Sequence, residues 1–176
     1  METSESSSGS RGSGFALTLV EGAFKHCPPY VGWRVLAAAL RAAGLRLGKA
    51  SVFWGVPTFS GGADVCNRLS IGAHCGFNLG CHFEVDDDVT IEDHVSVGHQ
   101  VTFLTRQPRG NGAAHAAATA PVHIGAGAWL GSRCVVMPGV TIGAGAVIGA
   151  ASVVVENVPP NVLYSGGRKV SLAKWR

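Results

Sequence analysis

Large apolar residues recur every six positions through the C-terminal half of this chain, and no other sequence feature constrains the fold as strongly. The series runs without a slip through Ile124, Leu130, Val136, Ile142, Ile148 and Val154. Four residues after each comes a small or apolar residue, at Ala128, Cys134, Val140, Ala146, Ser152 and Val158. A six-residue period fits neither the 3.6 of an α-helix nor the alternation of a simple strand, and it is typical of a β-helix.

Each hexapeptide is interpreted as one short strand plus a corner, with the large residue pointing inward and the small one filling the corner. Three such sides close one coil, and stacked coils pair their backbones as parallel strands. A high glycine content, 25 of 176 residues, agrees with a fold built from many tight turns. We therefore predict an all-β chain, a left-handed parallel β-helix over residues 49–166, with a short N-terminal helical segment.

The first half follows the same rule with two interruptions. One run comprises Ile71, Phe77 and Phe83, and a second comprises Ile91, Val97 and Phe103. The longer step between the two runs falls in the acidic segment 84–88, which we interpret as a turn. The repeat then stops between Thr105 and Pro121, so residues 106–120 are predicted to project as a loop, and long loops on rigid scaffolds often carry function.

The two ends differ in composition from the repeat region. Residues 1–14 are rich in serine and glycine and are predicted to be a disordered tail, and residues 167–176 form a short C-terminal tail. Residues 15–48 are predicted to form two short helices separated at Pro28-Pro29. One face of the second helix is expected to be apolar, at Val31, Val35, Leu36, Ala39, Leu40 and Ala43. Capping of the open β-helix end is favoured over contact with a membrane surface.

Charge and cysteine content exclude several classes of protein. The net charge of +3 comes without a continuous basic stripe, so no nucleic-acid partner is expected. The five cysteines are odd in number and contain no Cys-x-x-Cys pair, which argues against a disulfide framework and against a zinc ribbon. Because no run of 18 uncharged apolar residues occurs either, we expect a soluble protein of the reducing cytoplasm.

The repeats from residue 122 onward resemble those of the hexapeptide-repeat acetyltransferases. The resemblance covers residues 45–166 and is carried by three motifs, Trp-Leu-Gly, Met-Pro-Gly-Val-Thr-Ile-Gly and Ile-Gly-Ala-Ala-Ser-Val-Val, which begin at Trp129, Met137 and Ile148. The group most similar in these motifs comprises the maltose, galactoside and colanic-acid O-acetyltransferases. The resemblance implies a homotrimer that transfers an acetyl group from acetyl-CoA to a hydroxyl of a saccharide or small metabolite, in sites between subunits.

Two residues of this chain match substrate-contacting positions of that family. Asn78 matches an asparagine on an early coil that contacts the acceptor, and Trp129 matches a tryptophan that lines the cleft. For Asn78 the alternative is a corner residue whose amide pairs with the backbone. For Trp129 the alternative is an aromatic anchor of the subunit interface.

The family's catalytic base is missing from its usual place in this chain. The family uses a histidine at the start of the projecting loop, where this chain has Pro108, which cannot accept a proton. His115, seven residues further along the loop, is the candidate replacement for the base, and His99 is the second candidate. The C-terminal motifs also differ from those of the family, with Val155-Glu156-Asn157 and Gly166-Gly167 in place of the family residues. Arg168 and Lys169 are nevertheless candidates to bind the phosphates of CoA.

Two alternatives to an acyltransferase remain open at this stage. Loss of the base would fit a catalytically degenerate or repurposed β-helix. The γ-type carbonic anhydrases share the predicted fold and bind zinc through histidines of adjacent subunits, and His94 with His99 has the spacing of their paired ligands. The site as predicted contains no metal.

Overall fold

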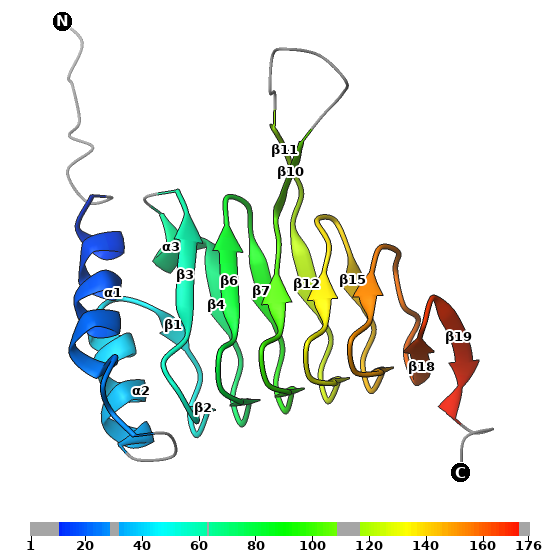
Figure 1. The fold of residues 1–176 in the computed structure, drawn as a ribbon, viewed down its shortest axis with the longest axis horizontal. Coiled ribbons are helices and arrows are strands. Elements are labelled where there is room, and N and C mark those ends of the chain that lie inside the picture. The colour runs from blue at the N-terminus through cyan, green and yellow to red at the C-terminus, as the bar shows by residue number, and fades with distance from the viewer. Residues whose placement is uncertain (1–10, 29–31, 63, 109–116, 173–176) are drawn as a thin grey trace, which may run out of the picture.

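The computed structural model describes residues 11–28, 32–62, 64–108 and 117–172. Within these ranges the chain winds into a prism of stacked coils, with helices packed across its N-terminal end (Figure 1). The all-β class and the N-terminal helical segment are confirmed, and the arrangement agrees with the left-handed parallel β-helix predicted from the six-residue period.

The prism has three faces, each a sheet of parallel strands contributed by successive coils. The first face contains β1 (Arg46–Leu47), β4 (Leu69–Ile71), β7 (Val89–Ile91), β12 (Val122–Ile124) and β15 (Thr141–Ile142). The second face contains β2 (Val52–Phe53), β5 (Gly76–Phe77), β8 (Ser96–Val97), β13 (Trp129–Leu130), β16 (Val147–Ile148), β18 (Val162–Ser165) and, antiparallel at its edge, β19 (Arg168–Ser171). The third face contains β3 (Thr58–Gly61), β6 (His82–Val85), β9 (Thr102–Phe103), β14 (Val135–Val136) and β17 (Val153–Val154).

The core is a set of ladders in which inward side chains of successive coils lie on one another. Ile71, Ile91, Ile124 and Ile142 are in register on the first face, and Phe59, Phe83 and Phe103 on the third. The N-terminal half of the core is aromatic, with ring centroids of Phe53 and Phe77 4.6 Å apart and those of Phe83 and Phe103 4.9 Å apart. The first coil, with Leu47, Phe53 and Phe59 six residues apart, extends the predicted runs toward the N-terminus.

The predicted acidic turn lies where β6 ends and β7 begins. Thr105 is fully buried beneath this turn, and its hydroxyl accepts hydrogen bonds from the backbone N–H groups of Asp86 (2.8 Å) and Asp87 (3.1 Å). The same hydroxyl donates to the carbonyl of Glu84 (2.8 Å). The inserted residues are therefore fixed by one buried threonine, which satisfies backbone groups that the interrupted ladder leaves without partners.

The predicted projecting loop begins and ends as a two-stranded antiparallel hairpin. Its strands are β10 (Arg106–Pro108) and β11 (Ala117–Thr119), which leave the prism between the third and fourth coils (Figure 1). Residues 109–116, which include His115, lie outside the described residues.

In the described ranges, three helices precede or interrupt the first coils: α1 (Arg11–Phe24), α2 (Trp33–Ala42) and α3 (Val65–Arg68). The first two helices lie on either side of Pro28-Pro29, as predicted. The first helix, α1, begins at Arg11, inside the range 1–14 predicted as a tail. Residues 1–10 lie outside the described residues. The buried face of α2 consists of Leu36, Ala37 and Leu40, whereas Val35 is 61% exposed, so its predicted place on that face is wrong.

The helices pack against the open end of the prism. Trp33 of α2 contacts Trp54 of the first coil, with ring centroids 6.0 Å apart, and Arg41 donates to the carbonyl of Leu47 (2.9 Å) and to that of Gly48 (2.6 Å). These contacts fit the capping role predicted for the segment. Among the described residues, no helix combines the length and the apolar character needed to cross a bilayer.

Candidate active site

Asn78 and Trp129, predicted from different parts of the sequence, line one hollow on the outer side of the second face. The hollow has a volume of about 130 Å³ and is lined by Trp54, Gly76, Asn78, Ser96, Val97, Gly98 and Trp129. Its floor is formed by the small residues Gly76 and Ser96, which are neighbours across β5 and β8, and Trp129 follows Ser96 on β13. The tryptophans on the first and fourth coils bracket this floor, which suits a flat ring.

Asn78 follows β5 and points outward because the preceding residue, Phe77, points into the core. Its amide Nδ2 donates to the carbonyl of Val97 (3.3 Å). The bond holds the side chain against the neighbouring coil and leaves the amide oxygen to accept a hydrogen bond. The backbone-pairing alternative considered for Asn78 is thus compatible with substrate contact, since one amide can do both.

Trp129 is the first residue of β13 and is 53% exposed in the single chain. An exposed tryptophan offers a large apolar surface to a ligand or to a second subunit. Its place beside Asn78 favours contact with a ligand. Its exposure alone does not distinguish that role from contact with a second subunit.

Cys81 stabilises the corner that positions Asn78. Its Sγ donates to the carbonyl of Asn78 (3.2 Å) and to that of Gly98 (3.5 Å), two residues that line the hollow. Burial raises the pKa of the Cys81 thiol to about 12. The thiol therefore stays protonated and acts as a weak hydrogen-bond donor rather than as a nucleophile.

The predicted CoA-binding residues, Arg168 and Lys169, lie at the far edge of the same face. β19 pairs with β18 through a turn at Gly166-Gly167, where both glycines have positive φ (55° and 74°), as a tight two-residue hairpin requires. Lys169 is opposite the buried Tyr164, and Arg168 is opposite the exposed Ser165. Because paired residues share a side of the sheet, Arg168 lies on the outer side of the second face and Lys169 on the other side.

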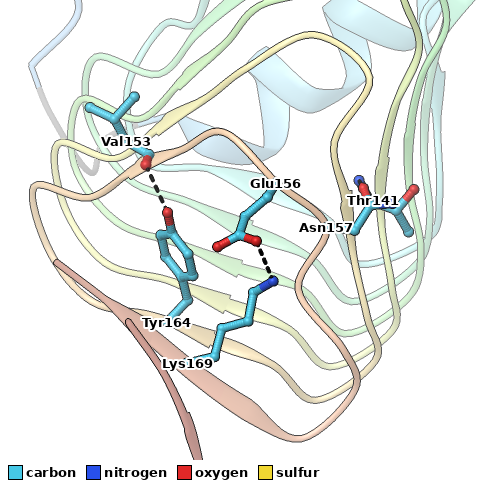
Figure 2. Close-up of polar contacts among 6 residues, drawn as sticks. All are labelled: Thr141, Val153, Glu156, Asn157, Tyr164 and Lys169. Atoms are coloured by element: carbon cyan, nitrogen blue, oxygen red, sulfur yellow. Dashed lines mark hydrogen bonds and ion pairs between the residues drawn. The ribbon is translucent and has the colours of Figure 1, made fainter. Parts of the chain in front are cut away.

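Lys169 is engaged by an acidic residue at this end of the prism. Its Nζ lies 2.7 Å from Oε2 of Glu156, and the hydroxyl of the neighbouring Tyr164 donates to the carbonyl of Val153 (3.2 Å) (Figure 2). Figure 2 also shows Asn157 beside Thr141, whose backbone N–H donates to the asparagine Oδ1 (2.8 Å). Arg168 is therefore better oriented than Lys169 to meet a phosphate on the outer face.

Of the described histidines, His99 is the nearest in the chain to the hollow, directly after the lining residue Gly98. Its backbone N–H donates to Ser132 Oγ (3.1 Å). His82 is held by two hydroxyls, with Nδ1 2.8 Å from Thr58 Oγ1 and Nε2 3.0 Å from Ser60 Oγ. His123 pairs with Glu92 at 3.0 Å on the first face.

The histidine pair considered for zinc is divided between two corners of the coil. His94 follows β7, between the first and second faces, and its ring stacks on that of His74 with centroids 4.9 Å apart. His99 follows β8, between the second and third faces. Within the part of the chain that the structure describes, no three metal-binding side chains gather into one group.

Most residues that line the hollow are not recognisable from the sequence. Trp54, Ser96 and Gly98 join Asn78 and Trp129 only because strands of different coils are in register. The signal that could have identified these residues is their position next to an inward-pointing residue of the repeat. Such outward residues must be compared between successive coils rather than along the chain.

Comparison with known proteins supports the family resemblance. Residues 121–155 match the model of the family described as bacterial transferase hexapeptide (six repeats). The chain is 42% identical to galactoside O-acetyltransferase of Escherichia coli (strain K12) over 103 residues, covering 53% of this chain and 49% of that protein. It is 41% identical to nodulation protein L of Rhizobium meliloti (strain 1021) over 102 residues, covering 56% of each. The matches thus span about half the length of these two relatives.

Solved structures resemble the chain over nearly its full length. A hexapeptide-repeat acetyltransferase of Vibrio cholerae O1 biovar eltor, complexed with acetyl coenzyme A, has a TM-score of 0.73 at 26% identity, covering 96% of this chain and 91% of that chain. A galactoside acetyltransferase in complex with coenzyme A has a TM-score of 0.75 at 24% identity, covering 95% and 84%. The likeness to the galactoside acetyltransferase structure shows the fold. The sequence matches confirm the predicted resemblance to hexapeptide-repeat acetyltransferases.

Proposed function

We propose that this hexapeptide-repeat chain is an acyl-CoA-dependent O-acyltransferase that acetylates a hydroxyl of a saccharide or small metabolite. The observation that carries the proposal is the common location of Asn78, Trp129 and Arg168 on the outer side of one face. The similarity to acetyltransferases, including one complexed with acetyl coenzyme A, supports the same reaction class.

The arrangement along this face suits a long donor and a small acceptor. Acetyl-CoA, when bound, supplies the acetyl group as a thioester. Arg168, on the outer side of the C-terminal hairpin, is proposed to bind its phosphates, with Lys169 contributing once it leaves Glu156. The strands between this hairpin and the hollow give the donor a continuous surface that ends at Trp129 and Asn78.

In the hollow, the acceptor is oriented by Asn78 and packed against tryptophan. The Asn78 amide oxygen is proposed to accept a hydrogen bond from an acceptor hydroxyl, while the apolar face of a sugar ring lies on Trp129. The attacking hydroxyl oxygen forms a bond to the acetyl carbon as the carbon–sulfur bond breaks. The hydroxyl proton passes to a base and then to the departing sulfur.

His115 is proposed as this base, in place of the family histidine. It precedes Ala117 by two residues, and Ala117 is paired with Pro108, which occupies the family's usual position for the base. His99 is the alternative base, because it adjoins the lining residue Gly98.

A homotrimer is proposed as the functional unit. The hollow, at about 130 Å³, is well below the roughly 300–1,000 Å³ of typical small-molecule sites, so a second subunit is needed to complete its walls. A cytoplasmic location is proposed because the five cysteines are odd in number and lack the spacing of a disulfide framework.

The direct test is release of CoA thiol from acetyl-CoA in the presence of a panel of sugars. Wild type is expected to release thiol and to acetylate at least one acceptor, and the His115→Ala variant is expected to lose this activity. Failure of the wild type to bind or turn over acetyl-CoA would support the degenerate β-helix instead, for which the loss of the family histidine at Pro108 is the motivating observation.

A further inference from the structure

The N-terminal helices close the prism with their inner sides and leave large apolar side chains exposed on their outer sides. On α1, Leu17 is buried, and Oε1 of Glu21 accepts a hydrogen bond from the backbone N–H of Phe59 (2.9 Å), which anchors the helix to β3. Phe15 and Leu19 lie four residues apart, on one side of the helix, and both are exposed. This side of α1 therefore faces away from the core.

The second helix, α2, has the same arrangement. Leu36 and Leu40 lie on its buried side, whereas Val35 is 61% exposed. Both helices lie across the N-terminal end of the prism (Figure 1), so Phe15, Leu19 and Val35 belong to the same end of the molecule. Large apolar side chains gathered on the outside of one end indicate a surface that contacts an apolar partner.

Positive charge is concentrated at this end of the molecule. Residues 15–49 contain one acidic residue, Glu21, and five basic residues, namely Lys25, Arg34, Arg41, Arg46 and Lys49. The net charge of the whole chain is only +3, and six of its eleven acidic residues lie within the segment 84–93 of the central coils. The carboxylate of Glu21 is turned toward β3, so the N-terminal end attracts anions more strongly than the rest of the chain does.

Two of these arginines line a pocket between α2 and the first coil. The pocket has a volume of about 350 Å³, and its lining includes Trp33, Arg34 and Arg41. The guanidinium of Arg34 lies over the Trp33 ring, 5.1 Å from the ring centroid, and Arg41 is fixed by its two hydrogen bonds to carbonyls of the first coil. Because each guanidinium has five N–H donors, two of them at one pocket are suited to bind a phosphate group.

Exposed apolar side chains, net positive charge and a pocket lined by arginines together match the surface of an anionic phospholipid bilayer. We propose that the N-terminal helices dock this protein on such a bilayer, with Phe15, Leu19 and Val35 inserted between the headgroups and with Arg34 and Arg41 bound to lipid phosphates. A nucleic acid would leave the apolar side chains in water, and a second copy of this end would place positive charge against positive charge. Docking and capping are compatible, because they use opposite sides of the same helices.

Val35→Asp tests the apolar contact, and Val155→Asp is its matched control. Val35 lies in the first turn of α2, where the helix dipole favours an aspartate, and Val155 is similarly exposed (66%) next to β17, the last strand of the third face. Co-sedimentation with vesicles of phosphatidylcholine and phosphatidylglycerol measures binding. Wild type and Val155→Asp are expected to bind these vesicles, and Val35→Asp is expected to bind them at least about tenfold more weakly.

Arg34→Ala tests the charged contact, with Arg133→Ala, at an exposed corner of the fourth coil, as the control. Arg34→Ala is expected to weaken binding to the mixed vesicles about fivefold, the usual contribution of one basic residue at an anionic surface, whereas Arg133→Ala binds as wild type does. Vesicles of phosphatidylcholine alone should bind wild type more weakly than the mixed vesicles do.

Three outcomes would overturn the proposal. The first is failure of wild type to sediment with the mixed vesicles, and the second is equal vesicle binding by Val35→Asp and Val155→Asp. The third is a rise in the melting temperature of wild type with inorganic phosphate but no binding to vesicles, which would restrict the pocket to soluble phosphates. If wild type does not bind vesicles and Val35→Asp has a lower mass in analytical ultracentrifugation, the exposed side chains belong to a contact between copies of this chain. None of these measurements depends on acetyl transfer.

Discussion

Pro108 lies directly opposite Ala117 in the hairpin that projects from the prism, at the position where the sequence resemblance predicts a catalytic histidine. His115, the base proposed in place of that histidine, precedes Ala117 by two residues.

If His115 is the base, His115→Ala lowers kcat by about 100- to 10,000-fold and leaves the KM for the acceptor nearly unchanged, because a base acts in the transition state. The pH dependence of kcat/KM should also lose its ascending limb, since the imidazole must be neutral to accept a proton. His74→Ala, at an exposed corner, serves as the control. A larger loss of kcat in His99→Ala than in His115→Ala would assign the role to His99.

Trp129→Ala separates substrate contact from subunit contact. The side chain is 53% exposed in the single chain, so the variant should keep its protomer fold. A ligand-contacting role predicts an acceptor KM raised about tenfold or more with unchanged mass in analytical ultracentrifugation. Dissociation of the assembly in the variant would instead identify Trp129 as an interface anchor.

The two basic residues of the C-terminal hairpin, Arg168 and Lys169, are expected to contribute unequally to the binding of acetyl-CoA. Arg168→Ala is expected to raise the KM for acetyl-CoA more than Lys169→Met does, because the ammonium of Lys169 is paired with Glu156. Glu156→Gln should lower this KM by releasing Lys169. Initial rates at varied acetyl-CoA concentration measure all three effects, and equal KM values in Arg168→Ala and wild type would contradict the assignment.

Phe83 is expected to be among the most costly positions in the core. It is fully buried and its ring contacts those of Phe53, Phe59, Phe77 and Phe103, which belong to three coils. Phe83→Ala should lower the free energy of unfolding by about 3–5 kcal/mol, and Phe83→Leu by less, since leucine fills part of the cavity. Urea denaturation measures the difference, with Phe15→Ala, at a 67% exposed position, as the control.

Cys81 predicts a specific loss of stability in alkali. Burial raises its pKa to about 12 in the folded chain, above the ordinary value of 9.0 for a thiol. The folded state therefore favours the neutral thiol over the thiolate. The contribution of Cys81 to the free energy of unfolding is complete below about pH 9 and is lost as the pH rises from 9 toward 12, because the thiol ionises first in the unfolded chain. Denaturation series at several pH values should show a weaker alkaline decline in Cys81→Ala than in wild type, although that variant starts from lower stability.

The sequence by itself determined the coil. Six-residue spacing of residues such as Ile124, Leu130 and Val136 requires a repeating side of constant length, and only stacked coils bury every member of the series. The interruption after Thr105 and the break at Pro28-Pro29 were likewise predicted, because proline and loss of apolar register act locally.

Only the tertiary structure decided which outward residues meet. Asn78 and Trp129 are 51 positions apart, and they share a hollow because β5, β8 and β13 are neighbours on one face. The exposed side of α1 depends on how the helix docks through Leu17 and Glu21, and the sides taken by Arg168 and Lys169 depend on the register of β18 with β19. A periodic pattern specifies which side chains point inward, whereas contacts between outward side chains are set by the stacking of distant coils, which no local interaction encodes.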